Sequence, residues 1–290
     1  METPAICKIG TCAWSYDDWR GVFYPEHLPS SERLEFYARH LSAVEVDATF
    51  HHAPKQSVIE HWAAITPDDF AFACKVPHAI THELRLREAT EPFHEFLAAM
   101  EPLGEKLWCV VAQLPPSFRP RRDEMALREF VRRLPTGVQF ALEFRNTEWH
   151  LPRIAHLLHE HGVAWVWNDL TSLKHQKEGA FEFLPDTTDF LYVRLMGDRG
   201  ETYEAGERKA HRYSRVMWPR DGGLESWGVR LGQAAADHRR IFVAVSNRFE
   251  GFGPRTAQRL GERMGVPVRL PSVLAPGDSA QSTEGQLDLL

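Results

Sequence analysis

The sequence predicts an α/β fold, namely a single (β/α)8 barrel of the TIM type with parallel strands. Short apolar runs alternate with amphipathic stretches along the chain, and we find eight of each. Seven of the apolar runs end in polar or charged residues: Asp47, Lys75, Gln113, Glu143, Asn168, Arg194 and the pair Ser246/Asn247. Parallel strands are buried on both faces, so an ionisable group at their carboxyl ends indicates a site. Because successive strands share this feature, we expect the site at the mouth of a closed barrel.

The expected elements follow one another in strict alternation. The apolar runs expected as strands are residues 6–12, 43–49, 70–76, 107–114, 138–144, 163–168, 190–196 and 241–246. The stretches expected as helices are 31–41, 54–65, 88–100, 123–134, 152–161, 171–180, 223–238 and 254–264, with the weakest pattern at 171–180. Pro54, Pro152 and Pro254 suit first helical turns, and Gly162 and Gly265 follow expected helix ends. An open doubly wound sheet is the alternative, but eight repeated units favour closure.

The length of 290 residues and the even composition indicate one domain. Barrels reach this size as a single unit, so we expect residues 1–270 to form one barrel domain. Residues 197–222 are rich in glycine and charge and should form the long connection after the strand at 190–196. The segment 271–290 is polar and poor in aromatic residues, so we expect a disordered tail there.

The composition indicates a globular protein of the cytoplasm. The four cysteines lie in or beside apolar runs without CxxC spacing, so we expect reduced core thiols. The first residues lack a signal-peptide pattern, and no apolar run reaches the ~20 residues of a membrane helix. We therefore expect no membrane partner. The net charge of −6 argues against nonspecific nucleic-acid binding, which depends on a basic surface.

Side-chain alternation sorts the expected strands into two faces. One face collects large apolar residues and should contact the helices. The other face should fill the barrel interior, and it collects Glu45, Asp47, Thr49, Ala71, Ala73, Lys75, Gln139, Ala141, Glu143, Ala164, Val166, Asn168, Tyr192 and Arg194. The predicted interior therefore contains charges of both signs.

Two interpretations fit such an interior. Uncompensated buried charges cost several kcal/mol each, so these groups must pair, bind a ligand or become neutral. The first interpretation is a purely structural network of ion pairs. The second is an active site in which Glu143 or Asp47 is the general acid or base and Lys75 and Arg194 stabilise negative charge. Amide side chains that would orient the substrate are Gln113, Asn168 and Asn247.

Histidines near the predicted mouth are further candidates. His82 follows the strand at 70–76 closely and could act in proton transfer, although a surface position is equally compatible with the sequence. His51 and His52 follow the strand at 43–49, but adjacent residues point apart on extended backbone, so a zinc site is not predicted. A divalent ion held by Asp47, Glu143 and Asn168 is a further option.

The loop after the strand at 6–12 is crowded with aromatic residues. Trp14, Tyr16 and Trp19 could pack over the barrel end or form a wall for a ring-bearing ligand. The chain contains no glycine-rich phosphate loop, GxSxG elbow or HExxH motif, so no cofactor is predicted from motifs.

Eight segments of this chain resemble the YecE-like family, a family of unknown function with a TIM-barrel-like fold. The segments are IGTCAWSYDDWRGVFYP, VEVDATF, FACKVPHAITH, QLPPSF, LEFRNTEW, VWND, YVRLMG and NRFEGFGPRTAQRL. They cover about residues 6–265 and follow the family's order. The resemblance implies the barrel fold but no reaction. Positions that match the family's shared segments are Glu45, Thr49, Lys75, His82, Gln113, Glu143, Arg145, Asp169, Arg194 and Asn247.

This chain departs from the family pattern at three places. Family members often have a histidine where this chain has Met196, a tyrosine near His51, and asparagine around Asp47. If the histidine is a catalytic acid–base group in the family, its replacement would make this chain an altered or inactive member.

We therefore expect an enzyme that performs acid–base chemistry, of isomerase or hydrolase type, on a small polar metabolite bearing phosphate or sugar groups. Glu143 would be the main acid–base residue, with Lys75 and Arg194 stabilising an anionic intermediate such as an enediolate.

Two other functions compete with this expectation. A non-catalytic binding barrel could associate with nucleic acid through Arg119, Arg121 and Arg122, although such a run is more often a solvated surface. A metal-dependent nuclease or sugar isomerase would need a divalent ion on two or more carboxylates at the strand ends.

Overall fold

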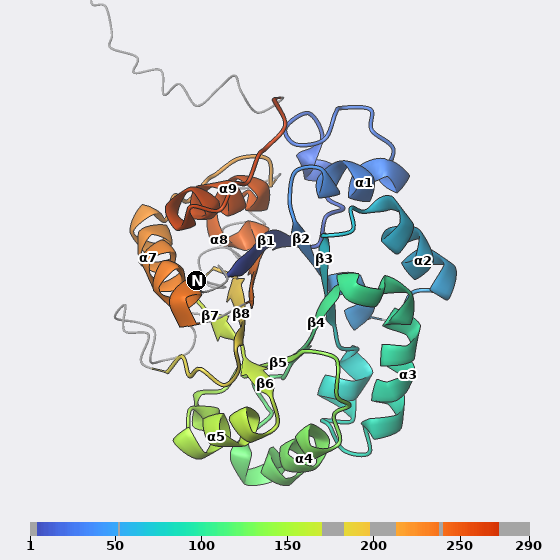
Figure 1. Cartoon of the computed structure of the whole chain (residues 1–290), viewed down its shortest axis with the longest axis vertical. Coiled ribbons are helices and arrows are strands. Elements are labelled where there is room, and N and C mark those ends of the chain that lie inside the picture. Colours follow the sequence, from blue (N-terminus) through green and yellow to red (C-terminus); the bar gives the residue numbers. More distant parts are fainter. Residues whose placement is uncertain (1–4, 52, 170–182, 198–212, 238–239, 273–290) are drawn as a thin grey trace, which may run out of the picture.

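A ring of parallel strands enclosed by helices forms the centre of the molecule (Figure 1). The computed structural model describes residues 5–51, 53–169, 183–197, 213–237 and 240–272. The strands are β1 (Ile6–Cys12), β2 (Ala43–Val46), β3 (Ala71–Lys75), β4 (Leu107–Gln113), β5 (Phe140–Glu143), β6 (Val163–Trp165), β7 (Trp167–Asn168), β8 (Phe190–Leu195) and β9 (Arg240–Val245). The helices are α1 (Arg33–Ala38), α2 (Gln56–Ile65), α3 (Thr90–Met100), α4 (Pro120–Arg132), α5 (Pro152–Glu160), α7 (Asp221–Asp237), α8 (Asn247–Glu250) and α9 (Gly253–Met264).

The expected TIM-type barrel is confirmed. The sheet order is β6-β5-β4-β3-β2-β1-β9-β8-β7, and all neighbours run parallel. The order ends in β6 and β7, which are consecutive pieces of the strand expected at 163–168. Because β6 pairs with β5 and β7 pairs with β8, this one segment joins both edges and closes the ring.

The closing segment is held partly by a side chain. The backbone N–H of Val166, between β6 and β7, donates to Leu142 O on β5 at 2.9 Å. On the other side, the Thr187 hydroxyl accepts from Trp165 N at 2.8 Å and donates to Val163 O at 2.7 Å. Thr187 therefore substitutes for a strand neighbour along β6.

Several boundaries differ from those that the sequence predicts. The strand expected over 43–49 ends at Val46, because residues Asp47–Phe50 form a 3-10 helix. Helix α4 begins at Pro120, three residues before its expected start, since proline suits the first helical position. The expected helix at 171–180, and all but the first two residues of the expected tail at 271–290, lie outside the described residues.

Two apolar cores form on the two faces of the sheet. The larger one packs between the strands and the helices and contains the bulky side chains predicted for that face, including Phe72, Phe140 and Trp165. The barrel interior contains mostly small residues at the level of the charged groups. Deeper in the interior, the Tyr192 and Phe242 rings stack with centroids 5.0 Å apart.

Two further observations bear on the environment of the chain. Among the described residues, no helix combines the length and the apolar character needed to cross a membrane. All four cysteines are free thiols, and Cys12, Cys74 and Cys109 are buried, as expected for core residues.

Gly10 provides a test of the close contact between β1 and β2. A Cβ on Gly10 would lie 1.8 Å from Ala43 O, so Gly10→Ala must displace paired backbone. We expect it to lower the free energy of unfolding by about 1–3 kcal/mol or to prevent folding. Urea denaturation measures this change, and a variant as stable as wild type would contradict the packing argument.

Gly232→Ala in α7 is the matched control for this measurement. Nothing lies within 4 Å of a Cβ built on Gly232. Alanine there should stabilise the helix by about 0.5–1 kcal/mol, because glycine loses more backbone entropy on folding.

Candidate functional site

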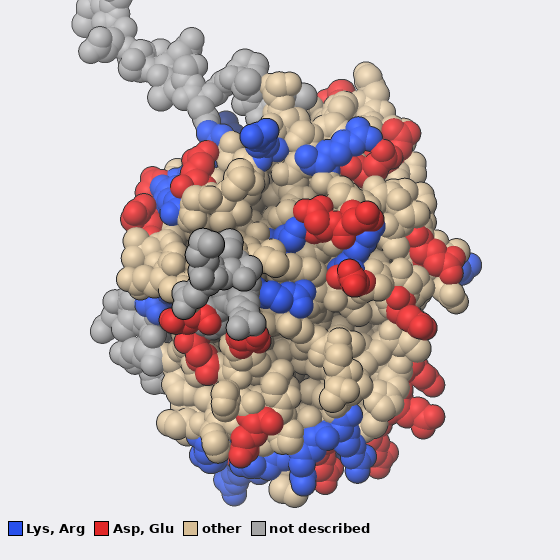
Figure 2. All heavy atoms as spheres, viewed as in Figure 1, with Lys and Arg blue, Asp and Glu red and all other residues tan. Residues whose placement is uncertain are grey.

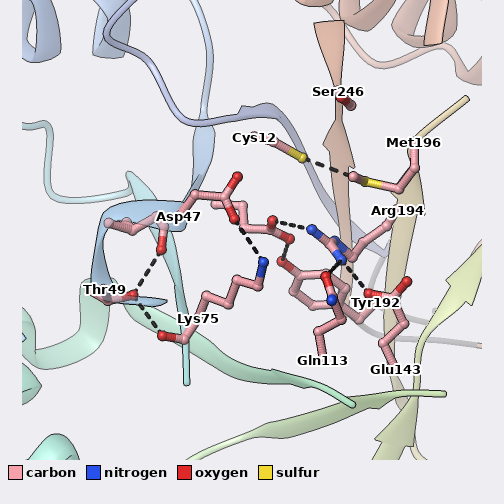
Figure 3. Close-up of polar contacts among 12 residues, drawn as sticks. Cys12, Asp47, Thr49, Lys75, Gln113, Glu143, Tyr192, Arg194, Met196 and Ser246 are labelled. Atoms are coloured by element: carbon pink, nitrogen blue, oxygen red, sulfur yellow. Dashed lines mark hydrogen bonds and ion pairs between the residues drawn. The ribbon is translucent and has the colours of Figure 1, made fainter. Parts of the chain in front are cut away.

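A network of buried charges spans the barrel interior at the carboxyl ends of the strands (Figure 3). Arg194 on β8 donates from one terminal nitrogen to Glu45 Oε1 on β2 at 2.7 Å and from the other to Glu143 Oε2 on β5. Arg194 is 1% exposed, and both glutamates are fully buried. The guanidinium therefore reaches across the barrel to two carboxylates on non-neighbouring strands.

Arg145 and Gln113 extend this network towards the mouth. Arg145 Nε lies 2.5 Å from Glu143 Oε1, so Glu143 has one arginine at each oxygen. The Gln113 carbonyl oxygen accepts from Arg145 at 3.1 Å and from Arg194 at 3.3 Å. Because this oxygen faces Arg145 and Arg194, the Gln113 amide nitrogen points away from the two arginines.

The pairing keeps these groups ionised despite burial. Burial alone would raise the pKa of Glu143, but the charges of Arg145 and Arg194 bring that pKa below its usual range. Burial would likewise lower the pKa of Arg194, and Glu143 and Glu45 hold it well above its usual range. Glu143 is therefore a fixed anion between two cations and a poor proton carrier near neutral pH.

Tyr192 forms a hydrogen bond to the second glutamate, Glu45, from deeper in the barrel. Its hydroxyl donates to Glu45 Oε2 at 2.7 Å, so Glu45 has partners at both oxygens. Burial and the negative charge of Glu45 raise the pKa of Tyr192 well above its usual range. Glu45 and Tyr192 complete the network, although the sequence singles out neither as a site residue beyond the resemblance at Glu45.

A second ion pair lies closer to solvent. Lys75 Nζ at the end of β3 donates to Asp47 Oδ1 at 3.3 Å, and the Asp47 side chain is 38% exposed. The same ammonium lies 4.1 Å from the centroid of the Phe50 ring. Figure 3 shows Lys75 pointing from β3 towards Asp47. Asp47 is thus the solvent-accessible end of this pair, and Lys75 is its buried end.

His82 lies beside this pair on a half-buried turn after β3. Its ring stacks on His78 with centroids 4.5 Å apart and lies 5.2 Å from Phe50. Burial lowers the pKa of His82 to about 4, with further lowering from the positive charges of His78, Lys75 and Arg145. His82 is therefore neutral at physiological pH, in a region of positive potential.

Asn168 and Asp169 lie at the closing segment of the barrel. Asn168 is paired in register with Arg194 and is 4% exposed. The Asp169 carboxylate accepts from the backbone N–H groups of Met196 and Gly197. Burial raises the pKa of Asp169 to about 6. Asp169 therefore ties the ends of β7 and β8 together.

The structure does not bring three of the expected ligand-binding residues to the mouth. Thr49 is fully buried, and its hydroxyl lies within hydrogen-bond distance of Val46 O and Lys75 O. Asn247 accepts from Gly253 N at 2.8 Å at the start of α9. Trp19 is fully buried in the aromatic core of the loop after β1, stacked on Tyr37, and not in a ligand wall. These three side chains support the backbone around the site.

The end of β9 explains the position of Asn247. Ala244 belongs to the interior core and alternation places the extended residue Ser246 on the same face, whereas Asn247 is the first residue of helix α8 and is 3% exposed. Within the expected pair Ser246/Asn247, Ser246 is therefore the residue nearer the mouth.

The loop after β1 contributes Tyr16 and Trp14 at its partly buried positions. The Tyr16 hydroxyl donates to Cys12 O at 2.7 Å. Trp14 packs edge-on against Trp62 of α2, with centroids 5.2 Å apart. Cys12 Sγ lies 4.0 Å from Met196 Sδ, so two sulfur atoms occupy the side of the mouth between β1 and β8. The strand pattern alone gives no reason to separate Cys12 from an ordinary core cysteine.

The remaining candidates receive less support from the geometry. Within the described parts of the chain, no three His, Cys, Asp or Glu side chains are placed to hold a metal ion. Arg119 pairs with Glu148 at 3.5 Å, and Arg122 lies 3.8 Å from Asp123. Basic side chains gather along the edge formed by α4, but acidic side chains lie among them (Figure 2). This edge has the mixed character of a solvated surface.

Replacement of Arg194 tests whether the network holds the barrel together. Arg194→Met leaves two buried carboxylates without their common cation, so the free energy of unfolding should fall by about 3–5 kcal/mol. Urea denaturation followed by tryptophan fluorescence measures the loss. Arg153→Met, which removes an exposed pair with Glu124, is the matched control and should cost less than about 1 kcal/mol. Similar small effects of both substitutions would refute a structural role for the network.

His82 predicts a specific dependence of stability on pH. Its pKa is about 4 in the folded protein and 6.5 as its ordinary value, so the unfolded chain binds more protons between these values. Stability contributed by neutral His82 is present above pH 6.5 and is lost as the pH falls towards 4. Imidazole NMR signals should show titration near pH 4, and His82→Gln should weaken the acid dependence of unfolding. A His82 midpoint near 6.5 would contradict the burial and the positive surroundings.

Comparison with known proteins connects this site to a family. Residues 8–280 match the family described as "Protein of unknown function DUF72". UPF0759 protein YunF of Bacillus subtilis is 29% identical over 287 residues, which cover 92% of this chain and 97% of that protein. UPF0759 protein YecE of Escherichia coli is 34% identical over 141 residues, so the match spans about half the length of that relative, 49% of each chain.

Solved structures of related proteins have the same fold. A DUF72 family protein from Thermotoga maritima superimposes with a TM-score of 0.73 at 27% identity, covering 90% of this chain and 99% of that one. A second, from Enterococcus faecalis, gives a TM-score of 0.69 at 17% identity and supports the fold alone. The family match extends over nearly the whole sequence and confirms the YecE-like resemblance. This chain belongs to the DUF72 family of proteins of unknown function.

Proposed function

We propose that this protein is an enzyme that performs acid–base chemistry on a small polar metabolite at the mouth of the barrel. The observation that carries the proposal is the contrast between two sets of charges. Glu45, Glu143 and Arg194 are at most 1% exposed, and Arg145 at Glu143 supplies the second positive charge that balances the two carboxylates. Asp47 and Lys75 form a long ion pair of 3.3 Å that reaches solvent through Asp47.

The proposal assigns proton transfer to Asp47 rather than to Glu143. A general acid or base must reach the substrate and change its protonation state near the working pH. Glu143 does neither, because both of its oxygens face arginines and its pKa is lowered. Asp47 has an exposed carboxylate, and Lys75 beside it can stabilise negative charge that develops on the substrate.

Gln113 and His82 suit the binding of an anionic or hydroxylated substrate. The Gln113 oxygen accepts from two arginines, and its amide nitrogen, which has no hydrogen-bond partner among the described residues, can donate to a ligand oxygen. Neutral His82 can donate or accept at the ring nitrogen that Thr81 does not contact. The positive potential at His82 favours a carboxylate or phosphate group on the substrate.

Deuterium exchange tests acid–base chemistry before the substrate has been identified. The protein is incubated in D₂O with sugar phosphates, hydroxy acids and free sugars, and proton NMR follows loss of carbon-bound hydrogen. We expect the protein to catalyse exchange with at least one anionic compound. Asp47→Asn should slow this exchange by about 10²–10⁴-fold, the usual contribution of a positioned acid or base.

Lys8 and Asp69 supply a matched control for this experiment. They form a similar pair at 3.2 Å, with the lysine buried and the aspartate exposed, but at the amino end of β1. Asp69→Asn should therefore leave exchange unchanged. Binding of a compound without deuterium exchange would identify a binding protein instead. Equal exchange rates for Asp47→Asn and wild type would show that another residue transfers the proton.

A further inference from the structure

We propose that Lys75 acts as a nucleophile that forms an imine with a small carbonyl compound bearing a carboxylate or phosphate group. This inference rests on the proposed function and adds the substrate class. The barrel places the Lys75 amine in the interior at the end of β3, where the residue is 8% exposed. It lies there between an acidic side chain and an aromatic ring.

Lys75 differs from buried Lys8 and half-buried Lys106 in how its amine is held. Lys106 donates to two backbone carbonyls, Ala63 O at 2.6 Å and Thr66 O at 2.7 Å. Lys8 donates to both the backbone and the side chain of Asp69. An ammonium has three hydrogens to donate. Among the described residues, Lys75 has one hydrogen-bond partner, Asp47, at the long distance of 3.3 Å.

An amine held in this way is available for reaction. Lys106 would lose two short hydrogen bonds if it gave up a proton, whereas Lys75 would lose one long one. The Phe50 ring, 4.1 Å from Nζ, covers one side of the amine with an apolar surface. Buried lysines with few polar contacts are the type that enzymes use for imine formation.

Asp47 provides the proton transfers that imine formation requires. Asp47 accepts a proton from the ammonium, and the neutral amine then attacks the carbonyl carbon, forming the N–C bond. The carbonyl π electrons move to oxygen, and a proton passes from the new N–H₂⁺ group to this oxygen to give a neutral carbinolamine. Return of the proton from Asp47 to the hydroxyl group allows water to leave, and a protonated imine remains. Overall, the ammonium and the carbonyl compound give the protonated imine and one water.

The surroundings favour an anionic carbonyl substrate over a neutral one. The His78 ring stacks on His82 with centroids 4.5 Å apart, the charges of Lys75, Arg145 and Arg85 contribute to lowering the pKa of His82, and Arg145 donates to the Gln113 amide oxygen. A carboxylate or phosphate placed there would lie near cationic groups while its carbonyl carbon faces Lys75. The substrate class is thus a 2-oxo acid or a phosphorylated aldehyde or ketone.

Reductive trapping tests this proposal directly. The 290-residue chain is incubated with pyruvate, dihydroxyacetone phosphate or neutral dihydroxyacetone in the presence of cyanoborohydride, whose hydride reduces a protonated imine to a stable secondary amine. Mass spectrometry of proteolytic peptides then locates the adduct among the seven lysines. We expect most of the label on Lys75, with faster labelling by the two anionic compounds. Asp47→Asn should slow labelling of Lys75 by about 100-fold, and Asp69→Asn should not change it.

The outcomes separate the imine from the broader acid–base function. No adduct on Lys75 with any of the three compounds, or equal labelling of exposed Lys55, would overturn the imine. Deuterium exchange that persists without trapping would leave acid–base catalysis in place and remove the nucleophilic role of Lys75. Labelling of Lys75 without any catalysed exchange would support the imine and refute proton abstraction by Asp47.

Discussion

The burial of the Arg194 guanidinium is the constraint on which the rest of the barrel depends. An unpaired charge in the interior would cost several kcal/mol, so two carboxylates have to meet it. They come from β2 and β5, which lie three places apart in the sheet order, and both pair with the guanidinium from β8. Ala73 lies in register with Glu45 and Ala244 with Arg194, so small interior side chains flank the network. The alanine-rich interior therefore leaves room for the long charged side chains.

The same network separates fixed charge from exchangeable charge at the mouth. Glu143 and Glu45 each have partners at both oxygens, so neither carboxylate has an oxygen free to contact a substrate. Asp47 lies on a 3-10 turn beyond β2, outside the rigid strand, and it reaches solvent. A buried neutral assembly of this kind gives a polar, preorganised base for the accessible pair. Our proposal therefore places the chemistry at Asp47 and Lys75 rather than at the more deeply buried Glu143.

The sequence predicts most of the fold and about half of the site's organisation. Alternation along the strands correctly places Glu45, Glu143 and Arg194 on one interior face, because buried parallel strands leave this pattern in the residue types. It cannot show that Arg194 contacts both glutamates, since that depends on which strands face each other across the ring. It also cannot distinguish Glu143, which is paired twice, from Asp47, which is paired once.

Other expectations fail where the backbone leaves the regular strand or where only one of two adjacent residues can face the interior. Thr49 follows the end of β2, so the 3-10 turn removes it from the interior face. Asn247 belongs to a pair in which alternation selects Ser246. Trp19 lies in the connection after β1, where the sequence has no strand or helix periodicity from which burial could be predicted. Only the packing of the Phe23 and Tyr37 rings around it shows that it is a core residue.

The short closing segment of the barrel has a mechanical consequence. Most of the ring is held by strands of four to seven residues, whereas β6 and β7 contain three and two residues, with a threonine hydroxyl in place of a neighbouring strand. Separating the strands at β6 and β7 would break fewer backbone hydrogen bonds than separating the longer strands. We therefore expect the barrel to open most easily at this closing segment. Asn168 in this segment is paired in register with Arg194. Movement of the closing segment would therefore shift the Arg194 guanidinium relative to Glu45 and Glu143. Small changes in this segment would then change the electrostatics of the whole mouth.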